Sequence, residues 1–130
     1  MLALAAAIVL PLSAFDAGQS GQPDLRAVAA EAIARAEAVS TTYESGGALY
    51  QIGGKYYYTL PVTQHDEHAV DFRVTLPAGA RLAGLYHTHP SHVRGAERFS
   101  PSDLKLADSV HVPMFVGVIG QPHMLVYRPL

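Results

Sequence analysis

The spacing of apolar residues changes once along this chain, and that change restricts the class of fold. Over residues 23–40 (PDLRAVAAEAIARAEAVS) apolar side chains recur every three or four positions, which gives a helix one apolar stripe. Beyond residue 40 the apolar residues alternate with polar ones or form short blocks between glycines and prolines, a pattern typical of strands. One amphipathic helix followed by strands predicts a helix packed on a sheet, and hence an α+β domain.

Six later segments have the character of strands and one has that of a helix. Residues 48–52 and 55–62 form an expected hairpin, because Gly53 and Gly54 between them tolerate the positive φ of a tight turn. The remaining expected strands are residues 69–77, 81–89, 113–120 and 123–130, and residues 100–110 form the expected second helix. This order predicts a single domain over residues 18–130 with a mainly antiparallel sheet.

Size and composition exclude several classes of protein. The chain has 130 residues, 49% of them hydrophobic and 15% charged, which suits one folded domain with one core. Its formal net charge is -2 and it has no long basic run, so we expect no nucleic-acid partner. Cysteine is absent, which excludes disulfides, thiolate metal sites and a cysteine nucleophile. Any metal must be bound by His, Asp, Glu or backbone oxygen.

The first fourteen residues, MLALAAAIVLPLSA, form an apolar run that is too short to span a bilayer. The run suits the apolar region of a secretory signal, with small residues at 13 and 14 near a possible cleavage point. We therefore expect residues 1–17 to be a signal segment, residues 15–22 to be a polar connector, and the protein to be exported to the periplasm or secreted. The alternatives are an apolar N-terminal helix or a reading frame that starts at the wrong Met, and the protein is cytoplasmic if the run is not a signal.

Three residues form a candidate zinc site. His87 and His89 are two positions apart on an expected strand, so their imidazoles point to the same face. Asp103 falls in the first turn of the following helix, where its carboxylate can reach back toward the end of that strand. Two imidazole nitrogens and one carboxylate oxygen, with a fourth position left for water, make the ligand set of a catalytic zinc.

Hydrolysis at such a site needs a base and a donor to the oxyanion. Glu44 is the candidate base, since the glycines at 46 and 47 allow backbones to approach closely. Glu67, in the polar loop QHDEH, is its rival. Ser100 is the candidate donor to the oxyanion of a tetrahedral intermediate.

Glu44, the stretch His87-Thr-His89-Pro90 and the stretch Ser100-Pro-Ser-Asp103 together resemble the JAMM motif of the JAB/MPN metalloprotease superfamily. The resemblance covers residues 42–130 and is greatest to small bacterial JAB-like domains of unassigned function. Ten residues separate His89 from Ser100, a longer loop than in the common form of the motif.

The resemblance implies a curved, mainly antiparallel sheet flanked by helices, of the cytidine-deaminase-like type. It implies a Zn²⁺ ion bound by His87, His89 and Asp103, with Glu44 as general base and Ser100 as the oxyanion donor. The implied reaction is hydrolysis of a peptide or isopeptide bond of a peptide or protein substrate by zinc-bound water that Glu44 activates.

Other interpretations of the same residues stay open. Ser100 and Asp103 also form the pattern of a helix cap, which is compatible with a metal site. His92 is either a further contact or a solvated loop histidine, and the loop of residues 64–68 is either a second metal site or plain polar loop. The whole domain is alternatively a catalytically silent binding module, a toxin-associated domain, or a periplasmic metal-binding protein.

Overall fold

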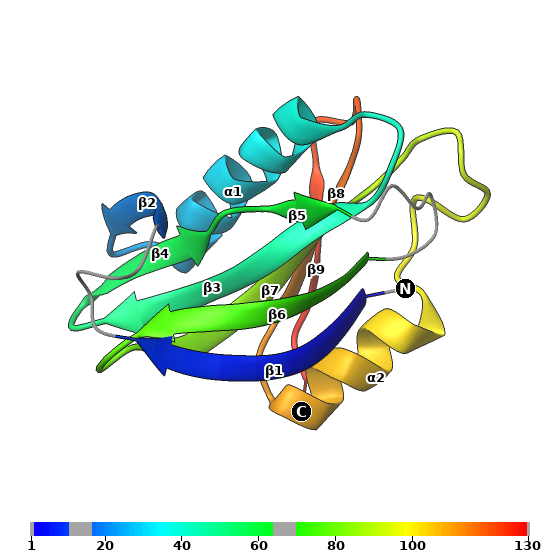
Figure 1. Cartoon of the computed structure of the whole chain (residues 1–130). Coiled ribbons are helices and arrows are strands. Elements are labelled where there is room, and N and C mark those ends of the chain that lie inside the picture. The colour runs from blue at the N-terminus through cyan, green and yellow to red at the C-terminus, as the bar shows by residue number, and fades with distance from the viewer. Residues whose placement is uncertain (1, 11–16, 64–69, 130) are drawn as a thin grey trace.

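A mixed, mostly antiparallel sheet organises the chain in the computed structural model, which describes residues 2–10, 17–63 and 70–129 (Figure 1). The elements in chain order are β1 Leu2–Leu10, β2 Ala17–Gln22, α1 Leu25–Val39, β3 Ser45–Ile52, β4 Lys55–Thr59, β5 Val62–Thr63, β6 Val70–Pro77, β7 Arg81–His89, α2 Pro101–Val110, β8 Met114–Val118 and β9 Met124–Tyr127. The described residues form a single small α+β domain, as the sequence predicts.

The larger sheet has the strand order β2-β4-β3-β7-β8-β9, with β5 paired to β3. Its strands pair antiparallel except β7 and β8, which are parallel. Helix α2 lies between these two strands in the sequence, and parallel neighbours need such a crossover because a tight turn would reverse the chain. This connection places the start of α2 just beyond the end of β7.

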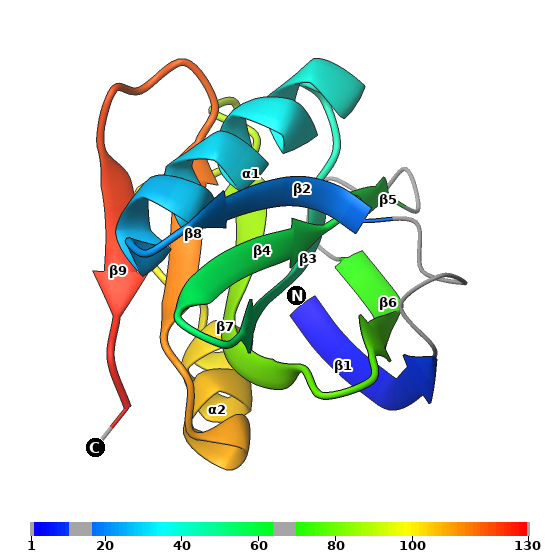
Figure 2. The same cartoon turned by 90° about the vertical axis from the view of Figure 1, so that its left-hand side faces the viewer.

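Side chains of the central strands alternate between two apolar cores. Leu49, Tyr86 and Phe115 join α1 in one cluster, whereas Leu85 and Met114 join Ala107 of α2 in the other. Helix α1 packs against β2, β3, β4, β7 and β8, and α2 contacts β1 and β8, so the helices cover different faces (Figure 2). Each face of β7 therefore belongs to a different helix.

Helix α1 confirms the predicted amphipathic helix. Asp24 caps it by accepting a hydrogen bond from the backbone N–H of Arg26 at 3.0 Å. Its buried face consists mostly of small residues, which let it lie close to the sheet. A Cβ added to Gly117 in β8 would come within 2.2 Å of Ile33 Cγ2, so this glycine also makes the close approach possible.

The predicted hairpin is confirmed, and the predicted polar connector is wrong for its described part. Ile52 pairs with Lys55 across the glycine turn, in which Gly53 has φ +60°. Residues 17–22 form the edge strand β2, paired with β4, and the Arg35 guanidinium donates to the carbonyl oxygen of Gly18 at 2.8 Å. Strand pairing uses backbone groups, so this mostly polar stretch forms a strand without an alternating apolar pattern.

The apolar residues at the N-terminus form strand β1, which pairs in parallel with β6. They do not form the apolar helix that is the alternative to a secretory signal. The signal segment over residues 1–17, the domain boundary after it and export all stay predictions. No helix in the described ranges is long and apolar enough to cross a bilayer.

Candidate metal centre

The two predicted imidazole ligands meet at the carboxyl end of β7. His87 and His89 follow Leu85 at steps of two, so they share its face of the sheet, the one that α2 covers. Their Nε2 atoms lie 3.0 Å apart. His87 is fully buried and His89 is 7% exposed. The strand periodicity thus brings both nitrogens to one point, as predicted.

Asp103 reaches that point from α2. Its side chain is 0% exposed, and its Oδ1 lies 3.3 Å from His87 Nε2 while its Oδ2 lies 3.4 Å from His89 Nε2. The same carboxylate closes a capping box, because Oδ2 accepts from the Ser100 backbone N–H at 2.9 Å and Ser100 Oγ accepts from the Asp103 N–H at 3.1 Å. The helix cap therefore holds Asp103 against both histidines, so the cap is compatible with a metal-binding role for the same carboxylate.

Glu44 completes the cluster from the residue before β3. It is 4% exposed, and its Oε1 lies 3.8 Å from His87 Nε2. Gly46 stands directly opposite His87 in the β3–β7 pairing, and a Cβ there would come within 2.4 Å of the Tyr86 carbonyl oxygen and 2.7 Å of His87 Cβ. The glycine after Glu44 is thus required for close packing of β3 on the histidine strand, as the sequence predicts.

Burial and the contacts between carboxylates and imidazoles shift the pKa values of Glu44, His89 and Asp103. Burial raises the pKa of Glu44 above its usual range. The pKa of Asp103 is held well below its usual range, because its contacts with the two imidazoles outweigh the burial that opposes them. The pKa of His89 is raised in spite of burial, since Asp103 and the carbonyl of Ala96 stabilise its protonated form. A buried carboxylate thus remains charged between two imidazoles.

The orientation of His89 is fixed by a bond outside the cluster. Its Nδ1 lies 2.8 Å from the carbonyl oxygen of Ala96, which can only accept, so Nδ1 carries the proton. In the neutral imidazole this leaves the lone pair of Nε2 directed at His87 and Asp103. Metal-binding histidines are generally oriented in this way by a carbonyl or carboxylate on the other nitrogen.

The opposite face of the strand carries a second set of bonds. Thr88 Oγ1 accepts a hydrogen bond from the Ser45 N–H at 3.2 Å, and Ser45 Oγ donates to the Ala36 carbonyl of α1 at 3.2 Å. Both side chains are fully buried. These bonds tie β3, β7 and α1 together directly behind the cluster, next to Glu44.

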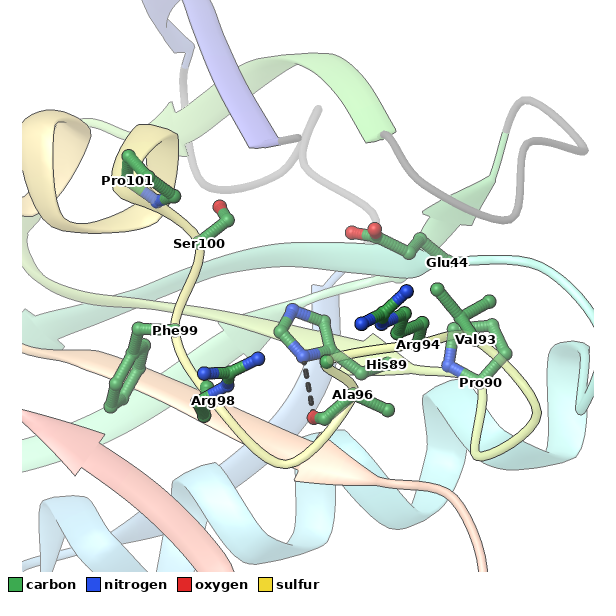
Figure 3. A pocket seen from close by; sticks show the side chains of 11 residues that line it. Glu44, His89, Pro90, Val93, Arg94, Ala96, Arg98, Phe99, Ser100 and Pro101 are labelled. Atoms are coloured by element: carbon green, nitrogen blue, oxygen red, sulfur yellow. Dashed lines mark hydrogen bonds between the residues drawn. The ribbon is translucent and has the colours of Figure 1, made fainter.

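A pocket of about 500 Å³ opens onto the cluster (Figure 3). Glu44, His89 and Ser100 line it, whereas Asp103 does not. The rest of its lining comes mainly from residues 90–99, the ten-residue loop that follows His89. Two arginines of this loop, Arg94 and Arg98, line the pocket too, although they belong to no motif in the sequence.

The chemistry of the cluster fits a bound cation. Within the described residues, the buried atoms His87 Nδ1 and Asp103 Oδ1 have no hydrogen-bond partner. Asp103 Oδ1 has only the contact with His87 Nε2 at 3.3 Å, and a cation beside a buried carboxylate oxygen offsets the cost of its burial. Glu44, His87 and His89 can each offer one ligand atom within 4.8 Å of the others. Imidazole and carboxylate donors together suit divalent transition metals.

The other sequence candidates lie elsewhere. His65, Asp66, Glu67 and His68, the predicted polar loop with the rival base and the possible second metal site, fall outside the described residues. His92 is exposed, as expected of a loop histidine, and does not line the pocket. Comparisons of the chain with protein-family models, with curated proteins and with solved structures gave no match. The family resemblance therefore stays a prediction drawn from the motif.

Proposed function

We propose that this protein is a zinc-dependent hydrolase of peptide or isopeptide bonds of the JAB/MPN type. The observation that supports the proposal is the buried cluster of two imidazoles and two carboxylates, brought together from β3, β7 and α2 and open to a pocket. Buried charged groups are rarely gathered at one point without a ligand or a reaction to serve.

The spacing of the cluster supports zinc as the metal. Zinc with ligand bonds of about 2.0–2.1 Å separates the ligand atoms of a tetrahedron by roughly 3.3–3.4 Å. The two Nε2 atoms lie 3.0 Å apart, Asp103 Oδ1 lies 3.3 Å from His87 Nε2, and the other carboxylate oxygen, Oδ2, lies 3.4 Å from His89 Nε2, all close to that separation. Small movements of side chains would therefore let these three residues hold the ion.

Two carboxylates compete for the third ligand position, and their surroundings favour Asp103. Asp103 is fully buried and touches both imidazoles, whereas Glu44 lines the pocket and lies 3.8 Å from His87 Nε2. A ligand belongs on the protein side of the ion, while a base must meet the substrate. We assign Asp103 as the ligand and Glu44 as the base.

Zinc bound here would polarise the substrate carbonyl and lower the pKa of water. Glu44 takes the proton of the attacking water and returns it to the leaving amine, so that amide and water become a carboxylic acid and an amine. Burial raises the pKa of Glu44 above its usual range, which makes the carboxylate a better acceptor for the proton of water. Ser100 Oγ accepts from the Asp103 N–H, so its own O–H remains able to donate to the oxyanion.

The test compares Glu44→Gln with the control Glu31→Gln, which removes the same charge from an exposed residue of α1 that does not line the pocket. We expect wild type and both variants to hold about one zinc per chain by elemental analysis. Cleavage of a peptide library, followed by mass spectrometry, should fall by roughly a hundredfold or more in Glu44→Gln only. Wild-type cleavage by Glu44→Gln would contradict the assigned base. Zinc in the wild type without cleavage of any peptide would favour the metal-binding alternative.

A further inference from the structure

The loop of residues 90–99, here called the arginine loop, is ordered by short-range backbone hydrogen bonds. The backbone N–H groups of Val93, Ala96 and Arg98 donate to the carbonyls three residues earlier, at 3.2, 3.1 and 3.1 Å. Gly95 has φ +83°, a conformation that favours glycine. The Ala96 carbonyl then accepts from His89 Nδ1 at 2.8 Å. The loop is therefore fixed directly to one of the proposed metal ligands.

The arginine loop places two cationic side chains at the pocket. Arg94 and Arg98 line the pocket beside the cluster, and Arg98 also lines a neighbouring hollow together with Glu97, which does not line the pocket itself. Figure 3 shows the two guanidinium groups on either side of the His89 imidazole in that view. Both arginines are exposed, and neither forms a side-chain hydrogen bond or ion pair with any described residue.

Two cationic groups at one pocket stand out against the charge of the chain, whose formal net charge is -2. The guanidinium is the side chain best shaped to bind a carboxylate, because its N–H groups form a planar fork. The rest of the pocket wall includes the apolar residues Val93 and Phe99 and two prolines, which suit the body of a peptide chain. The pocket thus combines apolar walls with two exposed guanidinium groups.

We propose that the arginine loop is a substrate-recognition loop, in which Arg94 and Arg98 bind a carboxylate of the peptide close to the bond that is cut. This inference rests on the proposed function for the identity of the substrate as a peptide. The carboxylate has two possible sources, the C-terminus of the peptide or the side chain of an Asp or Glu residue. Either source brings the same planar anion to the two guanidinium groups.

The test measures binding of five short peptides of equal length. One is an alanine peptide blocked at both ends, and a second has the same sequence with a free C-terminus. The other three are blocked and carry a central Glu, Gln or Lys. Binding is followed by NMR chemical-shift changes on the protein as purified and after incubation with zinc, and mass spectrometry of the same samples records any cleavage.

We expect peptides with a carboxylate to bind roughly five- to tenfold more tightly than their neutral partners, and the Lys peptide to bind most weakly. The preference should fall as salt is raised, since the guanidinium groups are exposed. If only the peptide with the free C-terminus binds more tightly than its neutral partner, the pocket recognises the C-terminal carboxylate. If only the Glu peptide does, the pocket recognises acidic side chains.

Arg94→Gln and Arg98→Gln should each weaken the preference, and the double variant should remove it. Arg128→Gln is the matched control, because Arg128 is exposed, lies outside the pocket and carries the same charge. The variants also separate binding by the arginines from direct binding of a carboxylate to zinc, which they leave in place. A preference that survives in the double variant overturns the proposal.

Failure of this inference and failure of the proposed function are distinguishable. A carboxylate preference that depends on the arginines, without cleavage, supports the recognition loop and counts against the hydrolase. Cleavage without that preference supports the hydrolase and overturns the recognition loop. Equal binding of all five peptides, or binding of none, also overturns it.

Discussion

Ser100 and Asp103 serve one helix cap, but only Asp103 is assigned to the metal, so two substitutions separate the roles. Ser100→Ala removes the hydroxyl that accepts from the Asp103 N–H at 3.1 Å and leaves the carboxylate in place. Asp103→Asn keeps an oxygen able to accept from the Ser100 N–H and removes the negative charge between the two imidazoles. The first variant tests the cap and the second tests the metal ligand.

The expected magnitudes differ. Loss of the cap hydroxyl costs about 1 kcal/mol of folding stability. Loss of even an outer partner of a metal ligand costs about 10- to 100-fold in metal affinity, so we expect Asp103→Asn, which loses the charged ligand itself, to bind zinc about a hundredfold more weakly, or worse. At a free zinc concentration of about 1,000 times the wild-type Kd, zinc stabilises the wild type by about 4.1 kcal/mol. A hundredfold weaker site gains only about 1.4 kcal/mol under the same conditions.

Thermal unfolding with and without zinc measures this difference directly. At about 4 °C per kcal/mol for a domain of this size, zinc should raise the Tm of the wild type by about 16 °C and that of Asp103→Asn by about 6 °C. Ser100→Ala should begin about 4 °C lower and still gain most of the wild-type shift. Asp108→Asn, the same substitution at an exposed position of α2, is the control for the general effect on the helix.

Two results would refute this reasoning. A full zinc-induced shift in Asp103→Asn would show that Asp103 is not a ligand, and the set of Glu44, His87 and His89 would then be preferred. Loss of the shift in Ser100→Ala would show that the cap and the metal site cannot be separated. Direct measurement of zinc content by elemental analysis guards against a shift caused by nonspecific binding.

Three further predictions concern the surroundings of the cluster. The pKa of His89 is raised, so below that pKa zinc must displace a proton from the imidazole. Zinc affinity, measured by competition with a chelator, should therefore rise with pH through that pKa and then level off. Gly46→Ala should lower the free energy of unfolding by about 1–3 kcal/mol or more, because the added Cβ would meet the Tyr86 carbonyl oxygen. Gly54→Ala, where an added Cβ has nothing within 4 Å, should cost far less. Equal costs in denaturant unfolding would contradict the packing argument. Thr88→Val leaves the buried Ser45 N–H without its acceptor, so it should lower the free energy of unfolding by about 1–3 kcal/mol. The zinc content should stay unchanged; denaturant unfolding measures the first effect and elemental analysis the second.

Local patterns predicted much of the fold. The helical stripe of α1, the glycine hairpin and the strand with alternating residues before the histidines are all encoded in neighbouring residues, and the structure contains each of them. The edge strand β2 was missed because its pairing uses backbone groups and leaves no apolar period in the sequence. The pairing of β1 with β6 was also missed, since an apolar run does not reveal its partner.

The sequence by itself determined which groups can act here. Two histidines two residues apart on a strand share a face because side chains alternate along it, and a Ser-x-x-Asp sequence at the start of a helix has the pattern of a cap. Only the tertiary structure decided that these groups meet. The parallel crossover through α2 brings Asp103 to within 3.4 Å of both imidazoles, and β3 brings Glu44 beside them, across long separations in the sequence. The pocket and its two arginines likewise depend on how the loop folds back onto His89, which no local pattern specifies.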